Sequence, residues 1–316
     1  MSASSSPLDP GFILTPLLLV LLILQVIILL LGVALLLRRS QSLLPRLLGG
    51  SPSGLTASPF TGSEIFLSAA CAFGGAIILQ VILIAVGQRL CPPPADGSMG
   101  FYHVLLAAGF QFGLLAGLIY AWHFHLRPRI RDSNTTPPAG ASPTGSFRSA
   151  LNDGIVAFLV AMPLVWLASW LWQNLLKRFG IDAPPQDIVL LFARRGDFAS
   201  LAAMIVFAVF VAPVVEELLF RVGLFRWLRG RVLRTLALLL PAVAFGALHG
   251  SLAALLPLIV LSIVFSIAYE RSGRPGVPII AHALFNLNSL ALLLAGFPTN
   301  ETDFKAALDE LLSFLS

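Results

Sequence analysis

Two adjacent acidic residues interrupt an apolar run in the stretch VAPVVEELLFRVG, residues 211–223. Glu217 and Arg221 are four residues apart, so on a helix they would form an ion pair on one face, with the acid N-terminal to the base. Glu216 is rotated by about 100° from Glu217 and cannot share that arginine equally well. We therefore expect Glu216 to face another polar group. A carboxylate in such apolar surroundings is suited to act as a general base.

Two histidines and an amide occur at helical spacing further along the chain. Pro241, Phe245 and His249 recur every four residues in PAVAFGALHG, and His282 and Asn286 are four apart in AHALFNLN. Each set would therefore lie along one face of a helix. A single histidine in an apolar helix is more often a hydrogen-bonded core residue than a catalytic one. Two histidines, an amide and an unpaired acid on three helices predict a shared site.

These residue types fit the non-covalent hydrolysis of an amide bond. A buried glutamate can take a proton from water, and a neighbouring histidine can hold that water. A second histidine and an amide can donate hydrogen bonds to a developing oxyanion. Other proteolytic chemistries lack their motifs, because the sequence contains no HExxH, GxSxG or GxGD pattern. Neither Cys71, within an apolar run, nor Cys91, before a Pro-rich loop, has the setting of a nucleophile.

The composition requires that these residues lie in membrane helices. The chain has 316 residues, of which 57% are hydrophobic and only 11% charged, and its mean hydropathy is +0.90. A soluble domain carries about 25% charged residues, so this chain is an all-α, polytopic membrane protein. Its net charge of +5 does not indicate nucleic-acid binding, because no basic face interleaved with aromatic residues is present. We expect the lipid bilayer and a membrane-associated substrate as its partners.

Apolar runs long enough for helices predict about eight transmembrane spans. The expected spans are 12–37, 64–88, 102–122, 154–174, 198–220, 235–250, 252–269 and 277–297. The fifth should run on towards Arg229, and Pro213 should free the carbonyl of Val209 within it. Two further segments should lie at the membrane surface: the interfacial or re-entrant segment 184–197 and the amphipathic C-terminal tail 301–316.

The basic residues predict the orientation of these spans. Fourteen of the 20 Lys and Arg residues lie in 38–63, 126–148, 221–234 and 271–274, which would be cytoplasmic if both termini were outside. Only six lie in the opposite segments, so the positive-inside rule favours external termini.

One difficulty concerns the depth of the two histidines in the membrane. His249 and His282 meet only if the sixth span starts outside the hydrocarbon or the eighth begins deeper than its apolar run suggests.

The three motifs together resemble those of a known family. EELLFR (216–221), FGALH (245–249) and HALFN (282–286) are similar to the EExxxR, FxxxH and HxxxN motifs of the CPBP family of intramembrane proteases. That family comprises CAAX proteases and bacteriocin-processing enzymes and is also called Abi. The resemblance covers roughly residues 195–297. It implies an all-helical core of eight transmembrane helices. We divide the chain into an N-terminal transmembrane region of three helices, 1–150, a catalytic core, 151–300, and the tail, 301–316.

The resemblance also implies a role for each motif residue in an endopeptidase that cuts near the cytoplasmic side. Glu216 becomes the catalytic base, His249 helps to hold the water, and His282 and Asn286 become oxyanion donors. The remaining motif residues should support the site: Glu217, Arg221 and Phe245. In the eukaryotic branch of the family the substrate is a prenylated CaaX protein. The Ala-, Leu-, Pro- and Arg-rich composition favours a bacterial cell membrane, where the substrate would be another membrane-bound protein or peptide.

Alternatives to a metal-free protease stay open at this point. Zinc is the alternative cofactor, because Glu216, His249 and His282 could supply the three protein ligands that a catalytic zinc ion accepts. We favour a glutamate-activated water without a required cofactor, since Asn286 beside His282 suits oxyanion binding better than zinc ligation. The protein could also be a catalytically silent family member that acts as a scaffold or immunity factor. A proton-coupled transporter is less favoured, because the two halves differ in polar content.

Overall fold

The computed structural model describes residues 16–48, 55, 58–128, 147–184, 189, 191–192 and 196–296. The described chain is helical and contains no strand, with one isolated bridge between Met99 and Gly196. Its first part holds α1 Pro16–Leu48, α2 Gly62–Leu90, α3 Phe101–Ala121, η1 Trp122–Leu126 and α5 Phe147–Arg178. The predicted tail at 301–316 and most of the predicted surface segment at 184–197 lie outside the described residues.

One long helical rod and three further helices follow. The rod consists of α7 Phe198–Val206, η2 Phe207–Val211, α8 Ala212–Glu217, η3 Leu218–Phe225 and α9 Arg226–Arg229. The last three helices are α10 Arg234–Leu248, α11 Leu255–Ser272 and α12 Gly276–Leu294. The eight predicted spans thus all correspond to helical segments, which confirms a polytopic, all-α protein.

Seven of these segments, all except α10, are long and apolar enough to cross a membrane. The sixth predicted span is the exception, because α10 has 15 residues and would extend only about 22 Å. The hydrocarbon layer is about 30 Å thick, so α10 ends inside it if it starts at one surface. His249 and Gly250 form the turn that ends this helix, with Gly250 at a φ of +65°. A short helix thereby places His249 at depth within the bundle.

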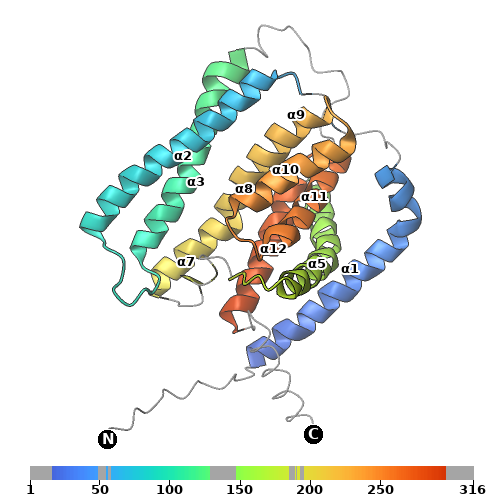
Figure 1. Ribbon diagram of the computed structural model, residues 1–316, viewed down its shortest axis with the longest axis horizontal. Coiled ribbons are helices and arrows are strands. Elements are labelled where there is room, and N and C mark those ends of the chain that lie inside the picture. The colour runs from blue at the N-terminus through green and yellow to red at the C-terminus, as the bar shows by residue number, and fades with distance from the viewer. Residues whose placement is uncertain are drawn as a thin grey trace, which may run out of the picture.

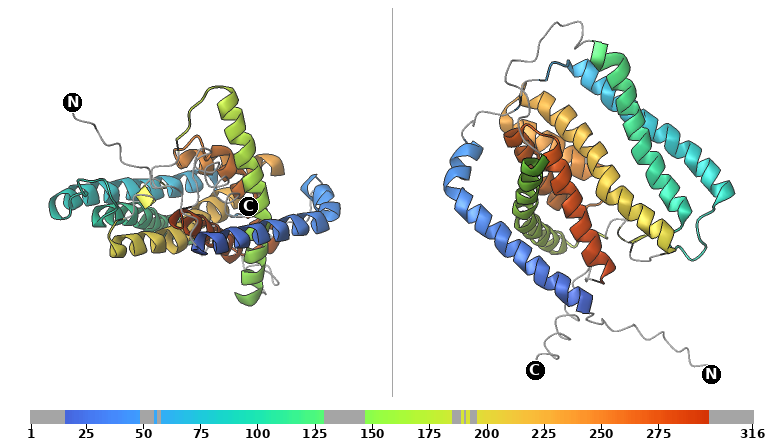
Figure 2. Two further views of the ribbon diagram at one scale, coloured as in Figure 1. Left: turned by 90° about the horizontal axis from the view of Figure 1, so that it is seen from below. Right: turned by 180° about the vertical axis from the view of Figure 1, so that it is seen from behind.

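The helices are arranged around α5 and α10 to α12 (Figure 1). The α2–α3 hairpin lies along one side of the rod, and α1 lies on the opposite side of the molecule (Figure 1). Seen from below, α5 crosses α1 at a steep angle (Figure 2). The two helices of the hairpin approach closely where one of them has a glycine. A Cβ atom at Gly117 would lie 2.0 Å from the carbonyl oxygen of Cys71, so only glycine fits there. A capping box between Thr61 and Glu64 begins the hairpin.

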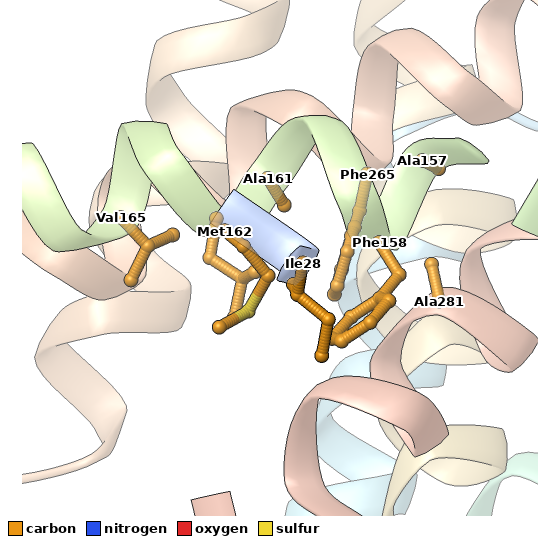
Figure 3. Close-up of a cluster of buried hydrophobic side chains, with 9 residues drawn as sticks. Ile28, Ala157, Phe158, Ala161, Met162, Val165, Phe265 and Ala281 are labelled. Atoms are coloured by element: carbon orange, nitrogen blue, oxygen red, sulfur yellow. The ribbon is translucent and has the colours of Figure 1, made fainter. Parts of the chain in front are cut away.

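The largest buried cluster fixes the position of α12. Ile28 of α1, Phe158 and Met162 of α5, Phe265 of α11 and Ala281 of α12 belong to it (Figure 3). Between membrane helices, close packing of such side chains, and not their removal from water, supplies stability that does not depend on the site itself. Because Ala281 is held in the cluster, the next residue along α12 projects towards the rod.

Ion pairs join the helix ends on the side predicted to be cytoplasmic. The Glu270 carboxylate near the end of α11 pairs with Arg229 of α9 and with Arg234 at the start of α10, where Nη2 to Oε2 is 2.7 Å. Arg274, in the next turn, pairs with Asp153 of α5. At the opposite end of the rod, Asp197 caps α7, and hydrogen bonds from Ser200 lower the pKa of its carboxyl group.

Candidate active site

The predicted ion pair between Glu217 and Arg221 is present at the centre of the rod. Nη1 of Arg221 lies 2.9 Å from Oε1 of Glu217, and neither side chain is exposed at all. Their spacing of four residues brings them together even though Arg221 lies in the π-helical segment η3. A buried charge is costly unless it is paired, so each of these residues depends on the other. This confirms the ion pair expected from the sequence.

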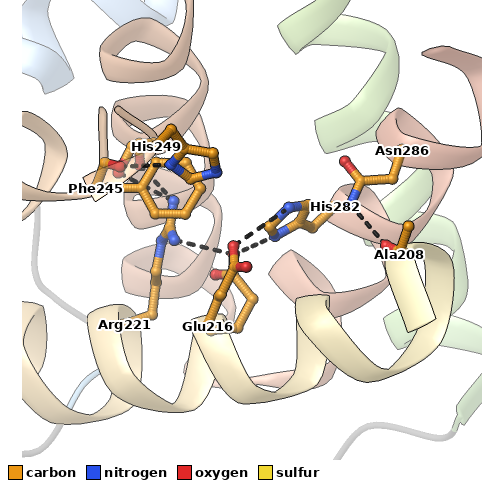
Figure 4. A network of polar contacts seen from close by, with 9 residues as sticks. Ala208, Glu216, Arg221, Phe245, His249, His282 and Asn286 are labelled. Carbon is orange, nitrogen blue, oxygen red and sulfur yellow. Dashed lines mark hydrogen bonds and ion pairs between the residues drawn. The ribbon is translucent and has the colours of Figure 1, made fainter. Parts of the chain in front are cut away.

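Glu217 also contacts a second helix, which the sequence did not indicate. Nδ1 of His282, on α12, lies 2.8 Å from the same oxygen, Oε1 of Glu217 (Figure 4). The carboxylate is an acceptor when ionised beside an arginine, so Nδ1 carries the hydrogen and donates it. A carboxylate that orients a histidine ring in this way also sets the direction of the other ring nitrogen. Here Nε2 of His282 points towards Glu216, with 3.9 Å between Nε2 and Oε2.

The two adjacent glutamates therefore differ in their surroundings. The Glu216 side chain is 18% exposed, whereas that of Glu217 is 0% exposed. Oε2 of Glu216 forms no hydrogen bond within the described part of the chain, since 3.9 Å to His282 is too long for one. As predicted, Glu216 faces a polar group other than Arg221. Oε2 of Glu217 is likewise unpartnered among the described residues, so the two acids differ in the two contacts to Oε1 of Glu217 and in exposure.

His249 approaches the site from the end of α10. Its Nδ1 lies 2.7 Å from the carbonyl oxygen of Phe245, and because a carbonyl only accepts, Nδ1 carries the hydrogen. In the neutral ring this leaves Nε2 as an acceptor. The Phe245 ring contacts both histidine rings, with centroids 4.7 Å from His249 and 5.9 Å from His282. Phe245 thus connects the FxxxH motif to the histidine of the HxxxN motif, and the direct role of His249 in the site stays a prediction.

Two residues of α11 take part that sequence reasoning missed. Nη2 of Arg221 donates to Oγ of Ser262 at 3.1 Å and lies 3.3 Å from its carbonyl oxygen. The Cζ atom of Arg221 lies 4.9 Å from the centroid of the Phe245 ring and 5.6 Å from that of Phe265. Such cation–π contacts are favourable where the cation is desolvated. No sequence motif lies in α11. Only the presence of the polar Ser262 in an apolar run could have suggested that this helix contributes to the site.

Asn286 lies one turn beyond His282 on α12, and its amide contacts the rod. Nδ2 of Asn286 donates to the carbonyl oxygen of Ala208 at 2.7 Å (Figure 4). The backbone is π-helical here, as the bond from the Ala212 amide to the Phe207 carbonyl shows. In a π-helical register the next bond would run from the amide of Pro213 to the carbonyl of Ala208. Proline has no N–H, so the carbonyl of Ala208 is free to accept from Asn286. The sequence prediction assumed α-helical bonding and named the carbonyl of Val209, which stays a prediction; the carbonyl that accepts from Asn286 is that of Ala208.

The depths of the motifs agree because α12 begins deep in the bundle. At 1.5 Å per residue, Glu217 lies about 18 Å before Arg229, and His249 lies about 22 Å after Arg234. His282 is only about 9 Å beyond the start of α12 at Gly276. Because His282 nevertheless bonds Glu217, α12 must start further from the end of α9 than its apolar run indicates. Which of the two geometries considered from the sequence holds relative to the hydrocarbon layer stays a prediction.

The alternative metal ligands do not form a ready binding site. Among the residues that the structure describes, no three His, Cys, Asp or Glu side chains are close enough to hold a metal ion. Glu216 and His282 approach each other, and the Phe245 ring lies between His282 and His249. The set Glu216, His249 and His282 therefore does not fit a zinc ion in this conformation.

Comparison with known proteins identifies the region that contains these residues. Residues 198–288 match the family model of Type II CAAX prenyl endopeptidase Rce1-like proteins. That range includes every motif residue of the site, from Glu216 to Asn286. A protein of Bacillus subtilis strain 168 named "Putative membrane peptidase YdiL" is 35% identical over 83 residues, which are 26% of this chain and 34% of that protein.

A second relative is more distant and carries no functional name. An "Uncharacterized protein" of Mycoplasma capricolum subsp. capricolum is 28% identical over 152 residues, 46% of this chain and 44% of that protein. The chain thus spans less than half the length of each of these curated relatives. No solved structure matches the chain.

Proposed function

We propose that this chain, whose residues 198–288 match the Type II CAAX prenyl endopeptidase Rce1-like proteins, is an intramembrane endopeptidase of the CPBP family that activates water with Glu216. The unequal environment of the two adjacent glutamates is the observation that carries this proposal. Both partners of Glu217 contact its Oε1, and its side chain is fully buried, whereas the side chain of Glu216 is 18% exposed. Only Glu216 can be reached by water and take its proton.

The surrounding side chains support the remaining steps of hydrolysis. Nε2 of His249 accepts a hydrogen bond from the water, since its Nδ1 is committed to Phe245. Glu216 takes one proton from the water, whose oxygen then attacks the carbonyl carbon of the substrate. The oxyanion that forms accepts hydrogen bonds from His282 and from the second N–H of Asn286. Glu216 then delivers the proton to the departing amine nitrogen as the carbon–nitrogen bond breaks.

The hydrogen bonds of His282 set a condition on this mechanism. Its Nδ1 donates to Glu217, so a second donation from Nε2 requires that both ring nitrogens carry a hydrogen. In that state the negative charges of Glu216 and Glu217 are offset by the positive charges of Arg221 and His282. A site without net charge is the favourable one at membrane depth.

The substrate class follows from the location of the site. A peptide that reaches residues within a helical bundle must itself enter the membrane or be tethered to it, so we propose a membrane-bound protein or peptide cut near the cytoplasmic side. The relatives from Bacillus subtilis and Mycoplasma capricolum support a bacterial cell membrane. Prenylation of CaaX sequences is a eukaryotic modification, so the bacterial substrate would have another membrane anchor.

The proposal is tested with Glu216→Gln and His249→Ala in cells and in proteoliposomes. Mass spectrometry of membrane peptides identifies cleavage products that wild-type cells form and Glu216→Gln cells lack. A reporter built from such a site should be cleaved by wild type and slowed at least about a hundredfold by Glu216→Gln, since loss of a general base has that magnitude. Asp96→Asn and His123→Ala, both far from the site in sequence and exposed, are the matched controls.

Retained cleavage by both site variants would refute the assignment of roles. A wild-type protein that is inserted and folded but forms no product would favour the catalytically silent alternative. Treatment with a strong zinc chelator, followed by addition of zinc, separates the two cofactor proposals. The metal-free mechanism predicts the same cleavage rate before chelation, after chelation and after zinc is added.

A further inference from the structure

We infer that Ser262 is a positioning residue of this site, which acts on His282 through Arg221 and Glu217; the inference rests on the proposed function. Ser262 lies on α11, the helix to which the sequence assigned no functional residue. Its hydroxyl oxygen accepts a hydrogen bond of 3.1 Å from Nη2 of Arg221, and its carbonyl oxygen lies 3.3 Å from the same nitrogen. Both side chains are 0% exposed, so water cannot replace this contact.

A continuous series of contacts leads from Ser262 to the proposed base. Arg221 pairs with Oε1 of Glu217 at 2.9 Å, and the same oxygen accepts the hydrogen of His282 Nδ1 at 2.8 Å. The ring so oriented presents Nε2 to Glu216 at 3.9 Å. A shift of the guanidinium would therefore move the oxygen on which the orientation of His282 depends.

Ser262 is needed because the guanidinium has few other polar partners. Nε of Arg221 is buried without a hydrogen bond among the described residues, and Cζ lies over the rings of Phe245 and Phe265. These apolar rings offer the guanidinium no hydrogen-bond acceptor that would fix its rotation. The hydroxyl and carbonyl groups of Ser262 fix that rotation, because hydrogen bonds to a planar guanidinium are directional.

The same helix offers a matched control. Ser266 lies one turn further along α11 and is also 0% exposed, but its Oγ has no hydrogen-bond partner among the described residues. Ser262→Ala and Ser266→Ala remove the same atom from equally buried positions, so loss of packing should be similar in both. The difference between them isolates the contact with Arg221.

Cleavage kinetics of a tethered reporter give the first test. Ser262→Ala should lower kcat about tenfold with KM unchanged, since it removes a hydrogen bond to a charged group while leaving the carbonyl contact. Ser266→Ala should stay close to wild type, and Ser262→Thr, which keeps the hydroxyl, should recover most of the activity. Equal kcat values for the two alanine variants would overturn the inference. The inference would also be overturned if Ser262→Ala lowered kcat and the thermal unfolding midpoint together. That outcome would indicate that Ser262 has only a structural role.

A second measurement does not depend on proteolysis. NMR of the ¹⁵N-histidine-labelled protein in micelles should show a hydrogen-bonded Nδ1–H of His282, assigned by its absence in His282→Ala. The signal should move or broaden in Ser262→Ala and stay in place in Ser266→Ala. An unchanged signal in Ser262→Ala contradicts the inference whether or not the protein cleaves a substrate. A wild-type protein without cleavage but with this shift would refute the proposed function alone.

Discussion

At the scale of single residues, the site assigns different tasks to two identical neighbours. Glu216 and Glu217 follow each other in the chain, yet helix geometry turns them to different faces. Glu217 is bonded to Arg221 and His282, and it serves to hold both. Glu216 is the more exposed of the two acids, and we propose it as the base. Buried ionic groups of this kind are costly, which is consistent with a chemical use.

Stability should separate the two acids. Glu217→Gln leaves Arg221 buried without its counter-charge, and loss of one partner of a buried pair costs about 3–5 kcal/mol. Glu216→Gln removes no ion pair with an arginine and should change the free energy of unfolding little. Unfolding in detergent micelles, followed by circular dichroism, measures both values. Equal losses of stability would contradict the division of roles.

At the scale of elements, the rod from α7 to α9 is built with two π-helical segments around the acids. The segments η2 and η3 precede and follow α8, which ends at Glu217. Segments of this kind occur frequently at functional sites. In η2 the π register and Pro213 together leave the Ala208 carbonyl for Asn286, so a backbone irregularity joins the rod to α12.

Removal of the proline should strengthen the helix and weaken the site. Pro213→Ala restores an N–H that competes with Asn286 for the Ala208 carbonyl. An interior proline disfavours a helix by about 3 kcal/mol relative to alanine, so the unfolding midpoint should stay the same or rise. Cleavage of the reporter should fall, because Asn286 loses its anchor. A variant as active as wild type would show that the Asn286–Ala208 contact has no role in catalysis.

The α2–α3 hairpin should be sensitive to added volume at its closely packed glycines, such as Gly117, but not at Gly74. A Cβ atom at Gly117 would meet the backbone of Cys71, whereas one at Gly74 would meet nothing within 4 Å. Gly117→Ala should therefore destabilise the protein by about 1–3 kcal/mol, the usual cost of overpacking. Gly74→Ala should be neutral or slightly stabilising, and the two unfolding midpoints measured side by side decide the matter.

At the scale of the whole molecule, the network of arginines and Glu270 lies at the ends of α9, α10 and α11. The basic residues predict that this end is cytoplasmic. If so, the site lies about 18 Å from the end of α9, within reach of a peptide that enters from the cytoplasmic side. The domain boundaries at 150 and 300 stay predictions.

Thiol labelling tests this orientation. Cys91 follows α2 at the end predicted to be external, and Ser63 begins the same helix at the opposite end. A membrane-impermeant maleimide added to intact cells should label Cys91 of the Cys71→Ala protein. It should label Ser63→Cys, in a background without the native cysteines, only after the membrane is opened. The reverse pattern would invert the assigned topology.

The sequence by itself determined the contacts that lie within one helix. The eight helical segments and the Glu217–Arg221 pair follow from apolar run lengths and from spacing along a helix, which local geometry sets. Contacts between helices depend on crossing, rotation and depth, and only the tertiary structure decided them. The fold brought Glu217 to His282, Ser262 to Arg221, and Asn286 to the carbonyl of Ala208. The physical reason is that a π-helical turn or a deep helix start changes which side chains meet without changing any spacing in the chain.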